Sequence, residues 1–112
     1  MSDDSLEQDD ERWLVVGGRR WRRQDPALPA DVASRLLSHL GRGRSGVRAA
    51  TSRGEDPAPS RRRVDLAKHG LGERGVPWWE QSADERRQRW AASLEDLDGL
   101  DEQGAGPTHP DR

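Results

Sequence analysis

WLVVGGRRWRRQDP, residues 13–26, is the stretch that decides the fold class. Its first four residues are apolar and of types that favour strands, and a pair of glycines after such a run is typical of a two-residue hairpin turn. The turn is therefore expected at Gly17-Gly18, with the second strand running over residues 19–24. Asp25-Pro26 then ends that strand, because proline has no amide hydrogen to donate. The segment predicts an antiparallel β-hairpin.

Strand alternation gives this hairpin two faces. A turn at Gly17-Gly18 sets Leu14 opposite Trp21 and Trp13 opposite Arg22. The face predicted to lie on the core carries Leu14, Val16 and Trp21. The other face, which is aromatic and basic, carries Trp13, Val15, Arg20 and Arg22.

Three helices are expected after the hairpin. The first begins at Pro29 and is expected to weaken at its glycines, and its apolar residues at helical spacing are Val32, Leu36, Leu37 and Leu40. The second covers residues 61–71. The third begins after a capping-box pattern at residues 82–85 and carries an apolar stripe of Trp90, Leu94 and Leu97. The predicted fold class is α+β, with an N-terminal hairpin packed on about three helices and lying against the helix that contains Leu36 and Leu40.

Charge divides the chain into three parts. Residues 1–11 hold six acids and no base, residues 95–112 hold six acids and one arginine, and the part between them carries an excess of arginine. Acidic segments without apolar periodicity are typical of disorder. We therefore predict a disordered tail over residues 1–11, one small domain over 12–97 with a mobile loop over 51–60, and a second disordered tail over 98–112.

Composition narrows the class of protein. A chain of 112 residues fits one domain, and it has no cysteine, which favours the cytoplasm over a disulfide-stapled secreted domain. The N-terminus lacks the basic and apolar regions of a signal peptide. No apolar run approaches the roughly 20 residues that span a bilayer. A membrane transporter is therefore not expected.

Patterns for catalysis, cofactors and metals are weak. Residues 41–46 read GRGRSG, but this G-x-G-x-x-G follows a predicted helix rather than a strand, so we interpret it as a helix end. Asp65, His69 and Glu73 are spaced to share a helix face, a pattern that ordinary ion pairs also give. No serine lies in a G-x-S-x-G context. We expect no catalytic residue, no cofactor and no metal.

Tryptophan and arginine together suggest one binding chemistry. Single-stranded nucleic acids bind to surfaces that combine aromatic stacking with phosphate neutralisation. The candidate nucleic-acid-binding residues are Trp13, Arg20, Arg22, Arg61, Arg62 and Arg63. The chain has 18 arginines against a single lysine, a bias that a GC-rich genome also produces, and tryptophans more often form a core.

Two blocks carry a family resemblance. The first is W-L-V-V at residues 13–16 followed by G-R-x-W-R at 18–22, and the second is A-K-x-x-L-G-E-R-G-x-P-W-W-E at 67–80. Both resemble a group of short uncharacterised bacterial proteins of GC-rich genomes, some of which carry the label of a Tol-type biopolymer transporter. The resemblance covers roughly residues 12–95 and implies no established activity.

Three functions stay open from the sequence. The first is a non-enzymatic binding or accessory protein whose partner is unknown. The second is a nucleic-acid-binding protein that uses the basic, tryptophan-containing face of the hairpin. The third is a small enzyme, which would need a pocket that the sequence does not indicate.

Overall fold

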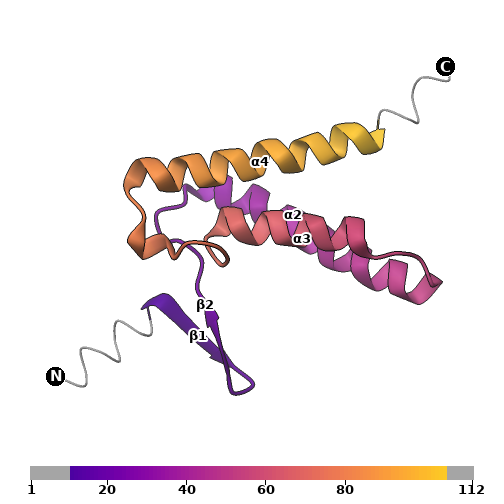
Figure 1. Cartoon of the computed structure of the whole chain (residues 1–112), viewed down its shortest axis with the longest axis horizontal. Coiled ribbons are helices and arrows are strands. Elements are labelled where there is room, and N and C mark those ends of the chain that lie inside the picture. The colour runs from indigo at the N-terminus through magenta and orange to yellow at the C-terminus, as the bar shows by residue number, and fades with distance from the viewer. Residues whose placement is uncertain (1–10, 106–112) are drawn as a thin grey trace.

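A computed structural model describes residues 11–105, with side chains described for 11–102. The chain forms a two-stranded antiparallel hairpin followed by three long helices, which confirms the α+β prediction (Figure 1). Of the tails predicted over 1–11 and 98–112, residues 1–10 and 106–112 lie outside the described residues. The elements are β1 (Trp13–Val16), β2 (Arg19–Arg22), α2 (Ala30–Arg53), α3 (Ala58–Leu71), the short 3-10 helix η1 (Trp78–Glu80) and α4 (Ala83–Ala105).

The predicted hairpin register is confirmed. Leu14 pairs with Trp21 and Trp13 with Arg22. Gly17 and Gly18 turn the chain with φ of 60° and 80°. Two successive positive φ angles are the signature of a type I′ turn, which few residues other than glycine adopt without strain.

The prediction of which hairpin face lies on the core is wrong. Leu14, Val16 and Trp21 are 43%, 55% and 41% exposed. The hairpin docks through its other face and onto the segment between α3 and α4 rather than onto α2. Trp13 packs edge-on against Trp79 with ring centroids 5.7 Å apart. Alternation separates the two faces but does not say which of them finds a partner.

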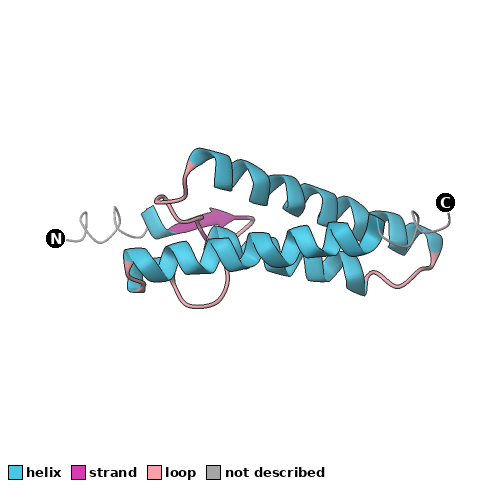
Figure 2. Cartoon of the chain, turned by 90° about the horizontal axis from the view of Figure 1, so that it is seen from above, coloured by secondary structure: helices cyan, strands magenta, loops and turns pink. Residues whose placement is uncertain are grey.

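The core lies between the three helices, which run along the long axis of the molecule (Figure 2). α3 packs along α2 on one side and against α4 on the other. The buried apolar side chains come from all three helices, as the apolar spacing predicts. They are Leu36, Leu40, Ala67, Leu71, Trp90, Leu94 and Leu97.

α2 does not end at its glycines and runs unbroken to Arg53. The reason is packing between helices. A Cβ on Gly43 would lie 2.8 Å from Cγ2 of Val64 and 3.0 Å from the backbone nitrogen of the same residue. A Cβ on Gly46 would lie 3.0 Å from Cβ of Ser60 in α3 and closer still to the Ser60 hydroxyl oxygen. The G-x-G-x-x-G motif therefore lies inside a helix, where two of its glycines let α3 approach.

Two further boundaries differ from the prediction. The loop expected over 51–60 is reduced to residues 54–57, because α2 continues to Arg53 and α3 begins at Ala58. α4 continues past Leu97 to Ala105, so the first part of the segment predicted as a tail is helix. The capping box is confirmed: the amide of Ser82 donates to the Glu85 carboxylate (2.8 Å), and the Glu85 amide donates to Oγ of Ser82 (3.1 Å). No helix among the described residues is both long and apolar enough to cross a membrane.

Candidate functional site

A buried carboxylate fixes the chain between the hairpin and α2. Asp25 is fully buried and accepts hydrogen bonds from Arg89 (Nη2 to Oδ2, 2.8 Å) and from Arg86 (Nη1 to Oδ1, 3.3 Å). Its Oδ1 also accepts from the amide of Ala27 (2.8 Å). Both arginines belong to α4, one helical turn apart, so this ion-pair cluster ties the exit of β2 to the last helix.

A second contact holds the end of the hairpin to η1. The indole nitrogen of Trp78, a buried residue, donates to the carbonyl oxygen of Arg23 (2.9 Å). Nε of Arg86 in turn donates to the carbonyl oxygen of Trp78 (2.8 Å). These contacts fix the base of the hairpin to η1 and α4, and the apolar face of the hairpin stays exposed within residues 11–102.

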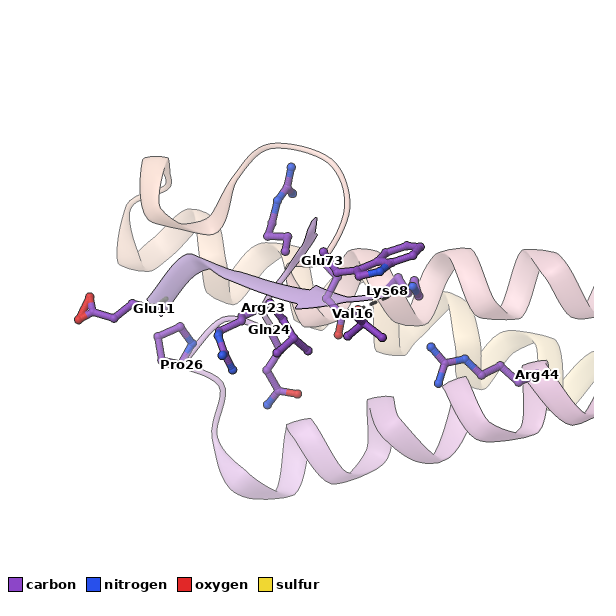
Figure 3. Close-up of a pocket in the computed structure, with 11 residues that line it drawn as sticks. Glu11, Val16, Arg23, Gln24, Pro26, Arg44, Lys68 and Glu73 are labelled. Carbon is purple, nitrogen blue, oxygen red and sulfur yellow. Dashed lines mark ion pairs between the residues drawn. The ribbon is translucent and has the colours of Figure 1, made fainter. Parts of the chain in front are cut away.

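A groove of about 780 Å³ opens beside that exposed face (Figure 3). The strands contribute apolar side chains, and Arg44 of α2 extends toward the hairpin from the opposite wall (Figure 3). We call this surface the hairpin groove. Its defining residues are Leu14, Val16, Trp21, Arg44, Lys68 and Glu73.

Lys68 gives the groove a charged inner wall. Only 12% of its side chain is exposed, its ammonium lies 5.2 Å from the ring centroid of Trp21, and Nζ lies 3.8 Å from the Glu73 carboxylate. Burial lowers the pKa of Lys68; Glu73 partly opposes this, and the nearby Arg74 and Arg44 guanidinium groups lower the pKa further. The groove therefore places the Lys68–Glu73 ion pair and the Arg44 guanidinium beside its apolar side chains.

The predicted nucleic-acid face of the hairpin is already engaged within the protein. The Arg20 guanidinium stacks over the Trp13 ring at 4.4 Å, and that ring also contacts Trp79. Nη1 of Arg22 donates to the carbonyl oxygen of Gly75 (2.9 Å). Trp13, Arg20 and Arg22 are thus brought together, but around η1 and the loop before it.

The three successive arginines of α3 diverge. Arg63 donates to Nδ1 of His39 (2.8 Å) and to the Asp101 carboxylate (2.9 Å), inside the helix bundle. Arg62 is exposed, and Arg61 lines a separate groove between α2 and α3. The structure therefore does not join Arg61, Arg62 and Arg63 to the hairpin residues in one surface.

One cluster among the described residues has the composition of a metal site. Ligand atoms of His39, Asp98 and Asp101 lie within 4.8 Å of one another. Nδ1 of His39 is approached at 2.8 Å by guanidinium groups of both Arg42 and Arg63, so it must accept and the ring proton lies on Nε2, 3.5 Å from Asp98. Guanidinium donors already occupy the groups that a metal would use.

These charges shift two pKa values within the same cluster. Burial lowers the pKa of His39 below its ordinary 6.5 and Arg42 lowers it further, while Asp98 and Asp101 oppose and Arg63 adds to the lowering. For Asp101, burial acts to raise the pKa, but hydrogen bonds from Arg42 and Arg63 outweigh it and hold the pKa below its ordinary value. The cluster works as an ion-pair network that joins all three helices.

The second pattern of acids and a histidine, which is Asp65, His69 and Glu73, does not form one site. His69 lies 3.7 Å from the Asp65 carboxylate, which also accepts from Arg74 at 2.7 Å. Glu73 pairs with Lys68 instead. Asp65, His69 and Glu73 are ordinary ion-pair partners in this arrangement.

Asp25 and Lys68 are the residues that sequence reasoning missed. Asp25 reads as a strand breaker before proline, and only the spacing of Arg86 and Arg89 on one helix face hints at a buried partner. Lys68 is the one lysine of the chain, and an isolated lysine next to a small apolar residue carries no motif. Neither pattern is specific before the fold is known.

Comparison with known proteins yields no match: no protein-family model, no curated protein and no solved structure is significantly similar to this chain. The family resemblance of its two sequence blocks therefore stays an expectation.

Proposed function

We propose that this protein is a non-enzymatic binding protein whose hairpin groove takes an acidic segment of a partner polypeptide that also carries apolar side chains. The observation that supports this most directly is the exposed apolar face of the hairpin, which stands opposite the cations of α2 and α3. A cytoplasmic location belongs to the same proposal, because the chain contains no cysteine.

The apolar part of the proposal rests on Leu14, Val16 and Trp21. Each exposes between two and three fifths of its surface, and the three lie side by side on one face of the hairpin. Contiguous exposed apolar side chains mark interaction surfaces more often than isolated ones do. A two-stranded hairpin is also marginally stable alone, so a partner that covers this face would stabilise it.

The acidic part rests on charge complementarity. Basic side chains outnumber acidic ones in the groove, which is lined by Arg23, Arg44 and Lys68 and by Glu11 and Glu73. Arg22 also borders the groove, but its guanidinium donates to Gly75 on the other side of the hairpin. Partner carboxylates would meet Lys68 and Arg44 while the apolar side chains cover the strands. Opposite charges across an interface raise the association rate and the specificity more than the affinity.

Enzymatic chemistry has less support. A lysine with a lowered pKa in a groove is a candidate nucleophile or base. The Lys68 ammonium lies against the Trp21 ring and pairs with the Glu73 carboxylate. The same contacts are sufficient to fix a cation on a binding wall.

The test is a calorimetric titration with a synthetic peptide of alternating glutamate and leucine, compared with a peptide in which serine replaces leucine. Two adjacent valines of β1 provide a matched pair of variants. Val16 faces the groove, and Val15, which is 65% exposed, lies on the opposite face. Replacing valine by threonine keeps the shape and removes about one methyl group's worth of apolar contact, about 0.8 kcal/mol or fourfold in Kd.

The proposal predicts that Val16→Thr weakens binding about fourfold and that Val15→Thr leaves it unchanged. Lys68→Gln should weaken binding and reduce its dependence on salt. Equal binding of the serine peptide would show that only charge is recognised. Equal effects of the two valine variants would place the partner elsewhere, and either result would reject this function.

A further inference from the structure

A second groove lies between α2 and α3. It encloses about 440 Å³, with Val47 and Val64 as its apolar side chains. All the other residues that line it are arginines, contributed by α2, by α3 and by the loop after α3. We call it the arginine groove, and its arginines are Arg44, Arg48, Arg61 and Arg74.

Most of this positive charge has no carboxylate partner. Arg74 pairs with Asp65 at 2.7 Å, and Arg48 donates to the hydroxyl of Ser45 at 3.2 Å. Within residues 11–102, Arg44 and Arg61 form no ion pair with an acidic side chain. Four guanidinium groups therefore share a single carboxylate.

Two of these guanidinium groups also act on a neighbouring side chain, Lys68. Arg74 and Arg44 both lower the pKa of Lys68, after the larger effect of its burial. Glu73 raises that pKa more strongly than either arginine lowers it, so the two smaller effects show only that both guanidinium groups lie close to Lys68. An anionic ligand stabilises a cluster of cations of this kind.

We propose that the arginine groove binds the backbone phosphates of a single-stranded nucleic acid. Guanidinium groups are planar donors that match phosphate oxygens in pairs, and the groove offers four of them, of which Arg74 pairs with a carboxylate and Arg48 donates to a hydroxyl. Several arginines around one groove suit a ligand with several phosphates better than a single phosphorylated side chain.

The lining of the groove favours a single strand over a duplex. The groove holds two apolar side chains among its arginines, which the unpaired bases of a single strand can contact, whereas a duplex keeps its bases paired inside and presents its phosphates. A flexible strand can enter the groove and lay sugars and bases against Val47 and Val64. This site goes beyond the proposed function, because it takes another class of ligand on another surface; only Arg44 lines both grooves.

Adjacent arginines of α3 supply a matched control. Arg61 lines the arginine groove, and the exposed Arg62 does not. The probe is a fluorescein-labelled single-stranded oligonucleotide of about 12 nucleotides, a length within the site sizes of single-strand-binding domains. Its anisotropy is measured with the full chain over a series of salt concentrations, first with wild type, then with Arg61→Gln and Arg62→Gln, and then with Arg48→Gln added to each.

Binding through four phosphate contacts predicts a slope of log K against log salt of about −3, since each contact on a single strand contributes about −0.7. The double variant at positions 48 and 61 should reduce the slope to about −1.5, and Arg62→Gln should leave it unchanged. The proposal is overturned if no binding occurs at low salt, or if Arg62→Gln acts as strongly as Arg61→Gln. Equal binding of a duplex or of poly-glutamate also overturns it, since the groove would then select neither strand form nor phosphate. None of these variants touches the apolar face of the hairpin groove, so this proposal and the peptide-binding function can fail separately.

Discussion

Replacing Asp25 with asparagine tests how the hairpin is held to the helix bundle. The carboxylate is fully buried and receives both Arg86 and Arg89 of α4. Asparagine has the same size and keeps an oxygen that the amide of Ala27 can still use. The substitution therefore removes the charge and leaves the local turn.

The expected loss follows from the burial of the pair. Arg89 is 9% exposed and Arg86 is 21% exposed, so neither guanidinium regains full hydration when the carboxylate charge is gone. Breaking a buried ion pair by removing one partner costs about 3–5 kcal/mol. We expect about 3 kcal/mol, because the asparagine oxygen still accepts one hydrogen bond. A core of this size supplies roughly 3–5 kcal/mol in total, so the variant should be close to unfolding.

Urea denaturation followed by tryptophan fluorescence measures this loss. The midpoint should fall strongly for Asp25→Asn with little change in the slope m. Asp84→Asn is the control, because Asp84 pairs with Arg87 at the exposed start of α4, where such pairs contribute under about 1 kcal/mol. Equal midpoints for the two variants would refute the view that Asp25 anchors the hairpin.

Three further outcomes concern the stability of the bundle. Gly43→Ala should destabilise by about 1–3 kcal/mol because its Cβ meets α3, whereas Gly41→Ala, which faces open space, should stabilise by up to about 1 kcal/mol in the same urea assay. The pKa of His39 is lowered in the folded state, so the unfolded chain takes up a proton first as the pH falls below 6.5; stability should drop between pH 7 and pH 5, and His39→Gln should flatten that profile. Thermal melts should show Trp13→Ala costing roughly 2 kcal/mol more than Trp21→Ala, since the first ring is packed and the second is 41% exposed; the reverse order would contradict the observed hairpin faces.

Local rules predicted the elements whose determinants are local. The turn at Gly17-Gly18 defined the hairpin register, and the reciprocal bonds of Ser82 and Glu85 began α4 as the capping pattern required. The apolar spacing also identified Leu36 and Leu97 as core residues. The hairpin register, the capping box and the apolar stripes each depend on residues that lie close together in the sequence.

What the sequence did not predict depends on contacts between distant segments. Gly43 reads as a weak point of a helix until α3 is seen against it. Asp98 reads as part of an acidic tail, yet it pairs with Arg35 at 2.7 Å, 63 residues away. The hairpin faces were separated correctly but assigned in reverse, because the packed Trp13 finds Trp79 only in the folded chain.

The candidate nucleic-acid-binding residues lie on separate surfaces for the same reason, because the packing of distant segments decides where each side chain lies. Arg61 to Arg63 are one run in the sequence, but their side chains leave a helix at successive 100° steps and reach three different environments. No pattern pointed to the hairpin groove, since it forms only where β1 and β2 stand beside α2 and α3.

The central claim, that the hairpin groove is the binding surface, has a direct spectroscopic test. The five tryptophans give five indole N–H signals in a proton–nitrogen correlation spectrum. Trp21 lines the groove, Trp13 and Trp79 lie on the packed side of the hairpin, and the other two are buried. Titration with the glutamate–leucine peptide should shift the Trp21 signal selectively. A shift confined to Trp13 and Trp79, or no shift at all, would contradict the account.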